Sequence, residues 1–346
     1  MITLKKLAEK CGVSIATVSN ILNDKSNVSE STKTRVLKMV EELGYKPNYL
    51  ARNLRIQKTN TIGLIIEDIT AFSTSHIVEG IMGFLERHGF KVIFENLRMY
   101  SKYKDFEKEK AKFIKGVNAA YSQLMAFRVD GIIYIAAHSR HIDFLSAFNE
   151  VPLVLCYSEC DTPDICEVVI DDKKAAAEMI DFFVEKGFSN IGIIKASEEN
   201  VHAKKRLEGC LESFKTHKLK VNPDFIVQGD WTRESGYEAC KKIFSIGFGK
   251  TEGKKTIFCF NDLMAAGVYD YLLEEKMEVG SDVCVAGFDN REISQFLRPN
   301  LTTLEIPLMD IGKKSAELLY NKISGIEQSS KKVDIPCRLI KRKSVR

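Results

Sequence analysis

The sequence predicts a small all-α head followed by a larger α/β body. The chain has 346 residues, which is too many for one ordinary hydrophobic core and indicates two or three compact units. Residues 1–45 show three short amphipathic helices, whereas from Thr61 onward Ile- and Val-rich runs alternate with amphipathic helices. That alternation is typical of parallel sheets that are covered by helices on both faces.

The head has the spacing of a helix-turn-helix. Thr3, Ser14 and Ser29 stand where their side chains can cap a helix, and Gly12 and Gly44 stand where the first and third helices are expected to end. A helix, a tight turn with glycine and a second capped helix form the helix-turn-helix outline. The apolar positions expected to face inward are Leu4, Leu7, Ala8, Val18, Ile21, Leu22, Val36, Val40 and Leu43.

A short basic segment follows the head. Pro47 ends the preceding helix, and Asn48 can cap a brief helix that carries Leu50, Ala51 and Leu54. A helix this short has no partner face of its own, so we expect it to be helical only under some conditions. The predicted domain boundaries are 1–46 for the head, 47–58 for the linker helix and 59–346 for the body.

The body is expected to form two lobes, each with a doubly wound parallel sheet, because nine strand-like runs are too many for one such sheet. The charged stretch 98–118 mixes Lys with Glu and Asp, which predicts a solvated helix. Residues 59–158 and 290–322 are assigned to the first lobe, and residues 159–289 and 323–346 to the second. The expected strands are 61–68, 91–97, 130–136, 152–157, 168–171, 190–196, 225–230, 256–262 and 283–289.

Charge is distributed unevenly along the chain. Residues 1–58 contain 11 Lys or Arg and 5 Asp or Glu, whereas the remaining residues contain 40 and 42. A basic head on a nearly neutral body predicts a polyanionic partner for the head alone. The N-terminal residues lack the pattern of a signal peptide, and no apolar run is long enough to cross a bilayer. We therefore expect a cytoplasmic protein that does not enter a membrane.

The sequence lacks the motifs of common enzymes and metal sites. The "GFGKT" run at 247–251 has Phe244 where a phosphate loop needs glycine, and neither GxSxG nor GxGxxG occurs. The "HSRH" run at 138–141 is expected to be an exposed loop. The nine Cys are scattered, and the closest three lack a fourth ligand at suitable spacing. The closest three cysteines are Cys156, Cys160 and Cys166. We expect no catalysis, no metal and no cofactor.

Ordered motifs in the head, linker and body carry a resemblance to a known family. The runs are "VSIATVS" at 13–19, "GYKPN" at 44–48, "ARNL" at 51–54, "FCFNDLMAAG" at 258–267, "VAGFDN" at 285–290 and "RPNLTTLEIPLMDIG" at 298–312. On these residues the chain resembles the LacI/GalR family of bacterial regulators over nearly its whole length. The resemblance implies a body like that of periplasmic binding proteins. It also implies a homodimer that binds a pseudo-palindromic operator in double-stranded DNA.

The second helix is the predicted DNA reader. The resemblance places Ile15, Ala16 and Asn20 at base-reading positions, on the face that helical spacing turns outward or towards its edge. Apolar Ile15 and Ala16 suit contact with a thymine methyl group, and the Asn20 amide can pair with adenine. The alternative, in which the hydroxyl side chains only cap and solvate the helix, applies in part to Ser14. The other DNA contacts implied in the head are Thr3, Ser14, Thr17, Ser19, Asn27, Ser29 and Tyr45.

Leu54 matches the leucine that this family wedges into the minor groove from paired linker helices. Two such wedges, one from each subunit, kink the duplex at the centre of the operator. Ala51 would let the two helices approach closely, and Asn48, Arg52 and Arg55 would lie near the DNA backbone. The alternative is a Leu54 side chain that packs on its own body.

The resemblance also implies a small-molecule effector between the lobes, at the carboxyl ends of strands. Arg206 matches an arginine that holds a hydroxyl or carboxylate, and Trp231 suits stacking on a sugar face, whereas Asp262 is expected to cap the next helix. Departures from the family pattern at 71–74 and Tyr157 disfavour a purine held between aromatic rings, and they also weaken the case for an ordinary sugar. The effector class that the resemblance implies is a sugar or sugar derivative. The predicted effector-binding set is Phe72, Ser73, Thr74, Tyr157, Arg206, Trp231, Asn261 and Asp289.

The sequence therefore predicts an effector-controlled repressor of transcription that acts as a dimer. One alternative is a regulator that is controlled by a protein co-regulator on the lobe surface. Another is a solute-binding receptor, which would share the two-lobed body but predicts a signal peptide and no basic head.

Overall fold

The computed structural model describes residues 2–22, 28–45, 59–103, 106–220, 222–327 and 330–346. The chain folds into two compact units, Met1–Thr59 and Asn60–Arg346. Within the described ranges, no helix has the length and apolarity needed to span a membrane. All nine cysteines are free thiols, and all except Cys160 are buried.

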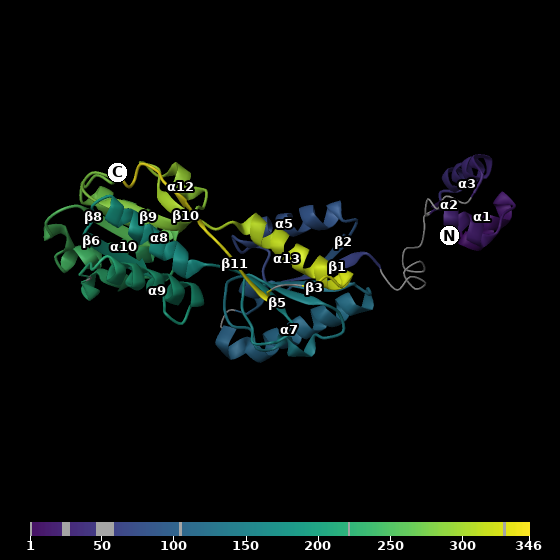
Figure 1. Cartoon of the computed structure of the whole chain (residues 1–346), viewed down its shortest axis with the longest axis horizontal. Helices are drawn as coiled ribbons and strands as arrows, with labels where there is room; N and C mark the ends of the chain where they lie inside the picture. The colour runs from purple at the N-terminus through teal and green to yellow at the C-terminus, as the bar shows by residue number, and fades with distance from the viewer. Residues whose placement is uncertain (1, 23–27, 46–58, 104–105, 221, 328–329) are drawn as a thin grey trace. The chain divides into compact units, whose positions relative to one another are not determined.

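The first unit is a three-helix head. Its helices are α1 (Leu4–Cys11), α2 (Ile15–Leu22) and α3 (Glu30–Glu42) (Figure 1). The Thr3 hydroxyl accepts from the Lys6 N–H at 3.3 Å, and the Ser14 hydroxyl accepts from the Thr17 N–H at 3.0 Å. Ser29 precedes α3, but its hydroxyl pairs with that of Thr32 at 2.9 Å and does not bond a backbone N–H. The buried core is Leu7, Ala8, Cys11, Val18, Ile21 and Val36.

The first sheet of the body has the order β11-β5-β4-β3-β1-β2, and all its strands run parallel (Figure 1). Alternate residues of β1 pack on opposite faces, because Leu64 lies in one core cluster and Ile65 in another. The strands are β1 (Thr61–Ile66), β2 (Lys91–Asn96), β3 (Gly131–Ile135), β4 (Leu153–Cys156), β5 (Cys166–Ile170) and β11 (Lys332–Ile335). The helices around it are α5 (Thr74–Arg87), α6 (Met99–Lys102), α7 (Phe106–Ala126), η1 (Leu145–Ala147) and α13 (Leu308–Ser324).

The second sheet has the order β12-β10-β9-β8-β6-β7, and only β12 runs antiparallel to its neighbour. The strands are β6 (Asn190–Lys195), β7 (Ile226–Gln228), β8 (Lys255–Cys259), β9 (Cys284–Asp289), β10 (Thr302–Glu305) and β12 (Arg338–Ile340). The helices are α8 (Asp172–Glu185), α9 (Val201–Thr216), η2 (Pro223–Phe225), α10 (Arg233–Ser245), η3 (Phe248–Lys250), α11 (Asp262–Glu274) and α12 (Ile293–Phe296). The predicted α/β body of two lobes is therefore present.

The chain crosses between the lobes later than the sequence predicted. β5 pairs with β4 and β11, so residues 166–170 and 332–335 belong to the first sheet and not to the second. β10 pairs with β9, so residues 302–305 belong to the second sheet and not to the first. The predicted lobe boundaries at 158, 290 and 322 are wrong. A short buried strand has the same apolar pattern in either sheet, so its sequence does not reveal its neighbours.

The charged stretch at 98–118 is helical over much of its length, but it is not solvated on all sides. Phe113 and Val117 of α7 are completely buried, and α7 continues to Ala126 with Leu124 also buried. These residues are four and seven positions apart, which places them on one face of the helix. The prediction of a solvated helix is wrong for that face, because charged neighbours concealed the apolar stripe.

Candidate DNA-reading helix and effector pocket

The outer face of α2 carries side chains that are exposed on the three-helix head. Ile15 is 40% exposed, and Ala16 is also exposed, although Val18 on the opposite face is completely buried. The Asn20 side chain is partly buried, and its amide forms no hydrogen bond among the described residues. An exposed apolar pair beside an available amide is suited to the edges of base pairs.

The other predicted DNA contacts in the head divide into two groups. Thr3, Ser14 and Ser29 are exposed, and the Ser14 hydroxyl lies 2.8 Å from that of Thr17. Ser19 is partly buried, and Tyr45 packs partly buried against the head core. The remaining predicted contacts lie outside the described residues. They are Asn27, Asn48, Ala51, Arg52, Leu54 and Arg55.

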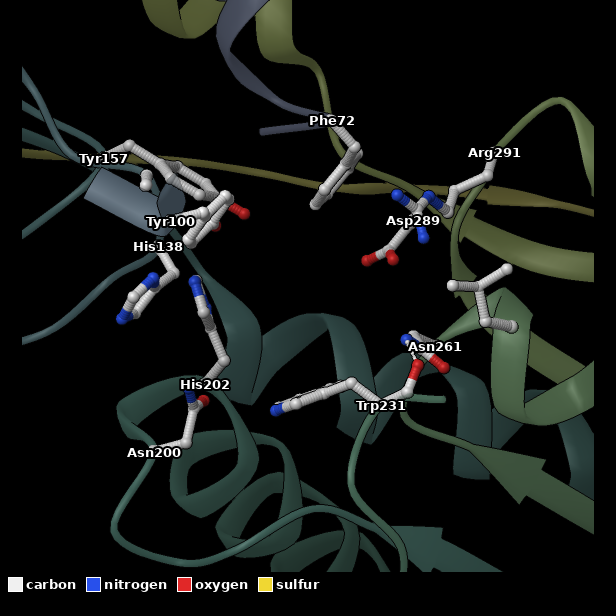
Figure 2. A pocket seen from close by; sticks show the side chains of 12 residues that line it. Phe72, Tyr100, His138, Tyr157, Asn200, His202, Trp231, Asn261, Asp289 and Arg291 are labelled. Carbon is white, nitrogen blue, oxygen red and sulfur yellow. Dashed lines mark hydrogen bonds between the residues drawn. The ribbon is translucent and has the colours of Figure 1, made fainter. Parts of the chain in front are cut away.

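The body contains a pocket of about 360 Å³ at the carboxyl ends of strands from both sheets (Figure 2). This is within the range of small-molecule sites in proteins. Five of its lining residues were predicted, and seven were not. The predicted residues are Phe72, Tyr157, Trp231, Asn261 and Asp289. The others are Tyr100, Ala137, His138, Asn200, His202, Leu263 and Arg291.

Asn261 fixes the second-lobe side of the pocket. It follows β8, and its side-chain oxygen caps α11 by accepting from the Met264 N–H at 2.8 Å. Its amide nitrogen donates to the Trp231 carbonyl at 2.9 Å, which holds the left-handed Trp231 backbone (φ 75°) beside the strand end. Asn261 is therefore the cap of α11, and the prediction that Asp262 caps this helix is wrong. Asp262 is fully buried, and its carboxylate accepts from the Thr303 hydroxyl at 2.6 Å.

Arg206 lies beneath the pocket and does not line it. Its side chain is almost fully buried, and Nε donates to Asp172 Oδ1 at 2.7 Å. Another guanidinium nitrogen donates to the Phe260 carbonyl, and the guanidinium carbon lies 3.4 Å from the centre of the Phe288 ring. Protein groups therefore occupy much of its hydrogen-bonding capacity.

Ser73 and Thr74 are likewise absent from the pocket surface. Both are fully buried, and the Thr74 hydroxyl donates to the Asp68 carbonyl at 2.9 Å. Of the residues predicted at 72–74, the structure brings only Phe72 to the pocket. Its ring lies opposite that of Trp231 across the open space (Figure 2).

A buried charge network lies at the base of the pocket. His202 Nδ1 lies 2.6 Å from Asp172 Oδ2, and His202 Nε2 accepts from the Ser139 N–H at 3.4 Å, which assigns the ring proton to Nδ1. Burial alone would raise the pKa of Asp172, but the His202 and Arg206 partners outweigh it and lower that pKa. Because Ser139 follows β3 and His202 lies on α9, this hydrogen bond also joins the two lobes.

Asp289 is the acidic group of the pocket. It ends β9 with a left-handed backbone (φ 105°), and its Oδ1 lies 3.9 Å from an Arg206 guanidinium nitrogen. Burial raises the pKa of Asp289 to about 7, although the charges of Arg206 and Arg291 oppose this shift. Arg291 lies over the Phe72 ring at 4.5 Å from its centre and supplies a cation beside Asp289.

The arrangement is suited to binding a polar ring. Aromatic faces from both lobes surround hydrogen-bonding groups, as in sites that hold carbohydrates or heterocycles. His202 has a carboxylate partner, but its other nitrogen is occupied by a backbone N–H, so it activates no nucleophile here. In the part of the chain that the structure describes, no three His, Cys, Asp or Glu side chains group as metal ligands.

Comparisons with known proteins identify the family. Residues 3–48 match the model "Bacterial regulatory proteins, lacI family", and residues 180–345 match "Periplasmic binding protein-like domain". Catabolite control protein A of Priestia megaterium is 31% identical over 348 residues, with 100% of this chain and 99% of the relative covered. The chain belongs to the lacI family of bacterial regulatory proteins. The "Probable HTH-type transcriptional repressor ExuR" of Bacillus subtilis (strain 168) is 30% identical, again over 100% and 99%.

The solved structure of the Lac repressor dimer bound to operator and the anti-inducer ONPF has a TM-score of 0.81 to this lacI-family chain. It covers 99% of this chain and 98% of the other at 24% identity, and this likeness shows the shared fold. The predicted fold class is confirmed. As a lacI-family protein, the chain is a DNA-binding regulator of transcription and not an enzyme.

Some of the pocket residues that sequence reasoning missed in this lacI-family body carry a local signal, and others do not. His138 was expected in an exposed loop, but it lines the pocket, and burial and the Arg140 charge lower its pKa. His138 lies just after β3, and the strand-end rule that points to Asn261 points to this position as well. Asn200 caps α9 directly after the β6 region, and His202 follows it. Tyr100 had no such signal.

Proposed function

We propose that this regulator is a cytoplasmic repressor that binds a pseudo-palindromic operator as a homodimer and is controlled by a carbohydrate effector. The observation that carries the DNA-reading assignment is the outer face of α2, where Ile15, Ala16 and Asn20 are available above a buried apolar stripe. Dimeric helix-turn-helix proteins place one such helix in each half-site, and their two-fold symmetry is matched by the operator. The shared fold with a Lac repressor dimer on its operator supports this assembly.

The pocket supports the effector assignment. Trp231 and Phe72 offer ring faces, while Asn261, Asp289 and Arg291 offer hydrogen-bonding groups at one side (Figure 2). A polyhydroxylated ring uses both kinds of contact. The pocket is lined by residues of both lobes, so a ligand that binds one interlobe arrangement more tightly shifts the protein towards it and changes the affinity for DNA.

The test is operator binding with and without ligand. Full-length protein is used to select DNA from a random library, and anisotropy then measures binding of the selected duplex. The expected result is two inverted half-sites whose affinity changes when a sugar is added. Enrichment of a single unrepeated site would contradict the dimeric reading, and an affinity that no sugar alters would contradict a carbohydrate effector.

A nucleobase is the second candidate effector, because the Phe72 and Trp231 rings lie on opposite walls of the pocket (Figure 2). Planar heterocycles gain from stacking on such faces. Hypoxanthine and guanine therefore belong in the same titration. A response to them and not to sugars would replace the carbohydrate assignment.

A further inference from the structure

Two successive carboxylates, Glu67 and Asp68, follow β1 and organise the first-lobe side of the pocket. Both are buried, and each binds a different segment of the chain. Asp68 holds α6, whereas Glu67 holds the loop after β3. These two attachments bring Tyr100 of α6 and the residues after β3 to the pocket.

The Asp68 carboxylate holds α6 by bonding the backbone of that helix. Its Oδ2 accepts from the Tyr100 N–H at 2.8 Å, and its Oδ1 accepts from the Thr70 N–H at 2.9 Å and from the Thr70 hydroxyl at 2.6 Å. The Met99 N–H donates to the Glu67 carbonyl at 2.8 Å. The Met99 side chain is buried in the core cluster on one face of the first sheet, so both hydrogen bonds and an apolar contact anchor α6.

The Tyr100 side chain differs from its anchored backbone. It is 50% exposed, it lines the pocket, and its hydroxyl forms no hydrogen bond among the described residues. Figure 2 shows it on the side of His138 and Tyr157, across the open space from Asp289. A large aromatic ring with an available hydroxyl, held on a fixed backbone, offers a ligand both stacking and a hydrogen bond.

Glu67 connects the same stretch to a second wall. Its carboxylate accepts from the Tyr134 hydroxyl at 2.6 Å, from the Ala137 N–H at 2.9 Å and from the Arg140 guanidinium at 2.7 Å. The Arg140 guanidinium lies 5.0 Å from the centre of the Phe106 ring of α7. The start of α7 therefore packs on the loop that presents Ala137 and His138 to the pocket.

We propose that α6 (Met99–Lys102) supports one wall of the effector pocket and that Tyr100 is a specificity-determining residue for a ligand with a polar ring. Tyr100 stacks on the ring from the first lobe and bonds one of its polar substituents, opposite the contacts made by Trp231 and Asn261. The proposal rests on the effector function proposed above. It assigns to α6, at the start of the charged stretch, a role in choosing the ligand and not in DNA binding.

The affinity test uses full-length protein and a panel of glucose, galactose, cellobiose, glucuronate, galacturonate and hypoxanthine. Wild type, Tyr100→Phe and Tyr100→Ala are titrated by calorimetry, with Phe127→Ala as a control, because Phe127 is an exposed aromatic of the same lobe that does not line the pocket. Loss of the hydroxyl should weaken the best ligand by about 3–10-fold. Loss of the ring should weaken it by more than about tenfold and change the order of preference within the panel.

A second measurement needs no ligand. Trp231 is the only tryptophan of the chain and lines the same pocket, so acrylamide quenching of its fluorescence reports how open the pocket is. Tyr100→Ala should increase the quenching constant, and Phe127→Ala should leave it unchanged.

The outcomes separate the two proposals. If a panel member binds wild type and Tyr100→Ala keeps both its affinity and its order of preference, Tyr100 does not determine specificity. An unchanged quenching constant in Tyr100→Ala would show that Tyr100 does not wall the pocket. If no panel member binds wild type, the proposed effector classes fail, and the quenching result still decides whether the wall exists.

Discussion

Replacing Asp289 with Asn should stabilise the ligand-free body at pH 8 while weakening effector binding. The Asp289 side chain is only 7% exposed, with an Arg206 nitrogen at 3.9 Å as its nearest cation. The Arg291 charge also lowers its pKa, and the Asp172 charge raises it, but burial dominates and sets that pKa at about 7. Asn keeps the shape of the side chain and removes the charge that burial disfavours.

The sign and size of the change in unfolding free energy follow from the folded-state and unfolded-state pKa values of Asp289. The folded-state pKa of about 7 lies above the ordinary value of 3.8, so the folded protein binds more protons between these pH values. The stabilisation by this group is therefore complete below about pH 4 and is lost as the pH rises through 7. Three pH units correspond to about 4 kcal/mol. Because the Asp289 carboxylate lines a pocket that admits water, we expect about half of this free energy, or about 2 kcal/mol.

The assay is urea unfolding of the full-length protein between pH 5 and pH 8, followed by Trp231 fluorescence. Asp289→Asn should be more stable than wild type by about 2 kcal/mol at pH 8 and by less than about 1 kcal/mol at pH 5, where much of the folded-state carboxyl is still protonated. Asp334→Asn, which removes an exposed carboxylate in β11, is the control. A gain of the same size at both pH values, or a loss at pH 8, would refute the assignment of a buried, readily protonated carboxyl.

Three further changes test the head, the linker and the buried network. Asn20→Ala should cost about 1–3 kcal/mol of operator binding and relax one half-site position, as measured on all single-base operator variants. Leu54→Ser, in the predicted linker, should abolish bending of the operator, as measured by circular permutation, and leave body unfolding unchanged. Asp172→Asn should cost about 3 kcal/mol of body stability in urea, because the buried Arg206 loses its partner. Asp171→Asn, at the adjacent helix cap, should cost little. A result no larger for Asp172 than for Asp171 would contradict the ion-pair argument.

The head was predictable because its signals are local. Thr3, Ser14 and Gly12 mark helix ends within a few residues of the groups they bond, so the sequence order alone carries the information. The same reason explains the single failure there. Ser29 was expected to bond the backbone of α3, but other hydroxyls nearby compete for it.

Pocket residues were predictable from the sequence only where they directly follow a parallel strand. Asn261 and Asp289 end parallel strands, and strand ends converge at one edge of a sheet. Arg206 was placed by resemblance, and its burial depends on Asp172, a partner 34 residues away that no local pattern reveals. Tyr100 depends on a contact with Asp68 across 32 residues, inside a stretch whose charges suggested full solvation. Long-range pairing of this kind is a property of the folded chain and not of a motif.

The adjacency of Glu67 and Asp68 matters for anyone who would retune this regulator as a biosensor. The Glu67 carboxylate binds the loop that carries His138, and the Asp68 carboxylate binds the helix that carries Tyr100. Two adjacent residues therefore support both walls. A library that varies Tyr100 alone leaves Glu67 and Asp68 in place. Replacing residues 67–68 would remove the supports of both walls at once, because Glu67 accepts from the Ala137 N–H and Asp68 accepts from the Tyr100 N–H. An exchange of the first-lobe walls with another regulator therefore has to carry residues 67–68 together with α6 and the loop after β3.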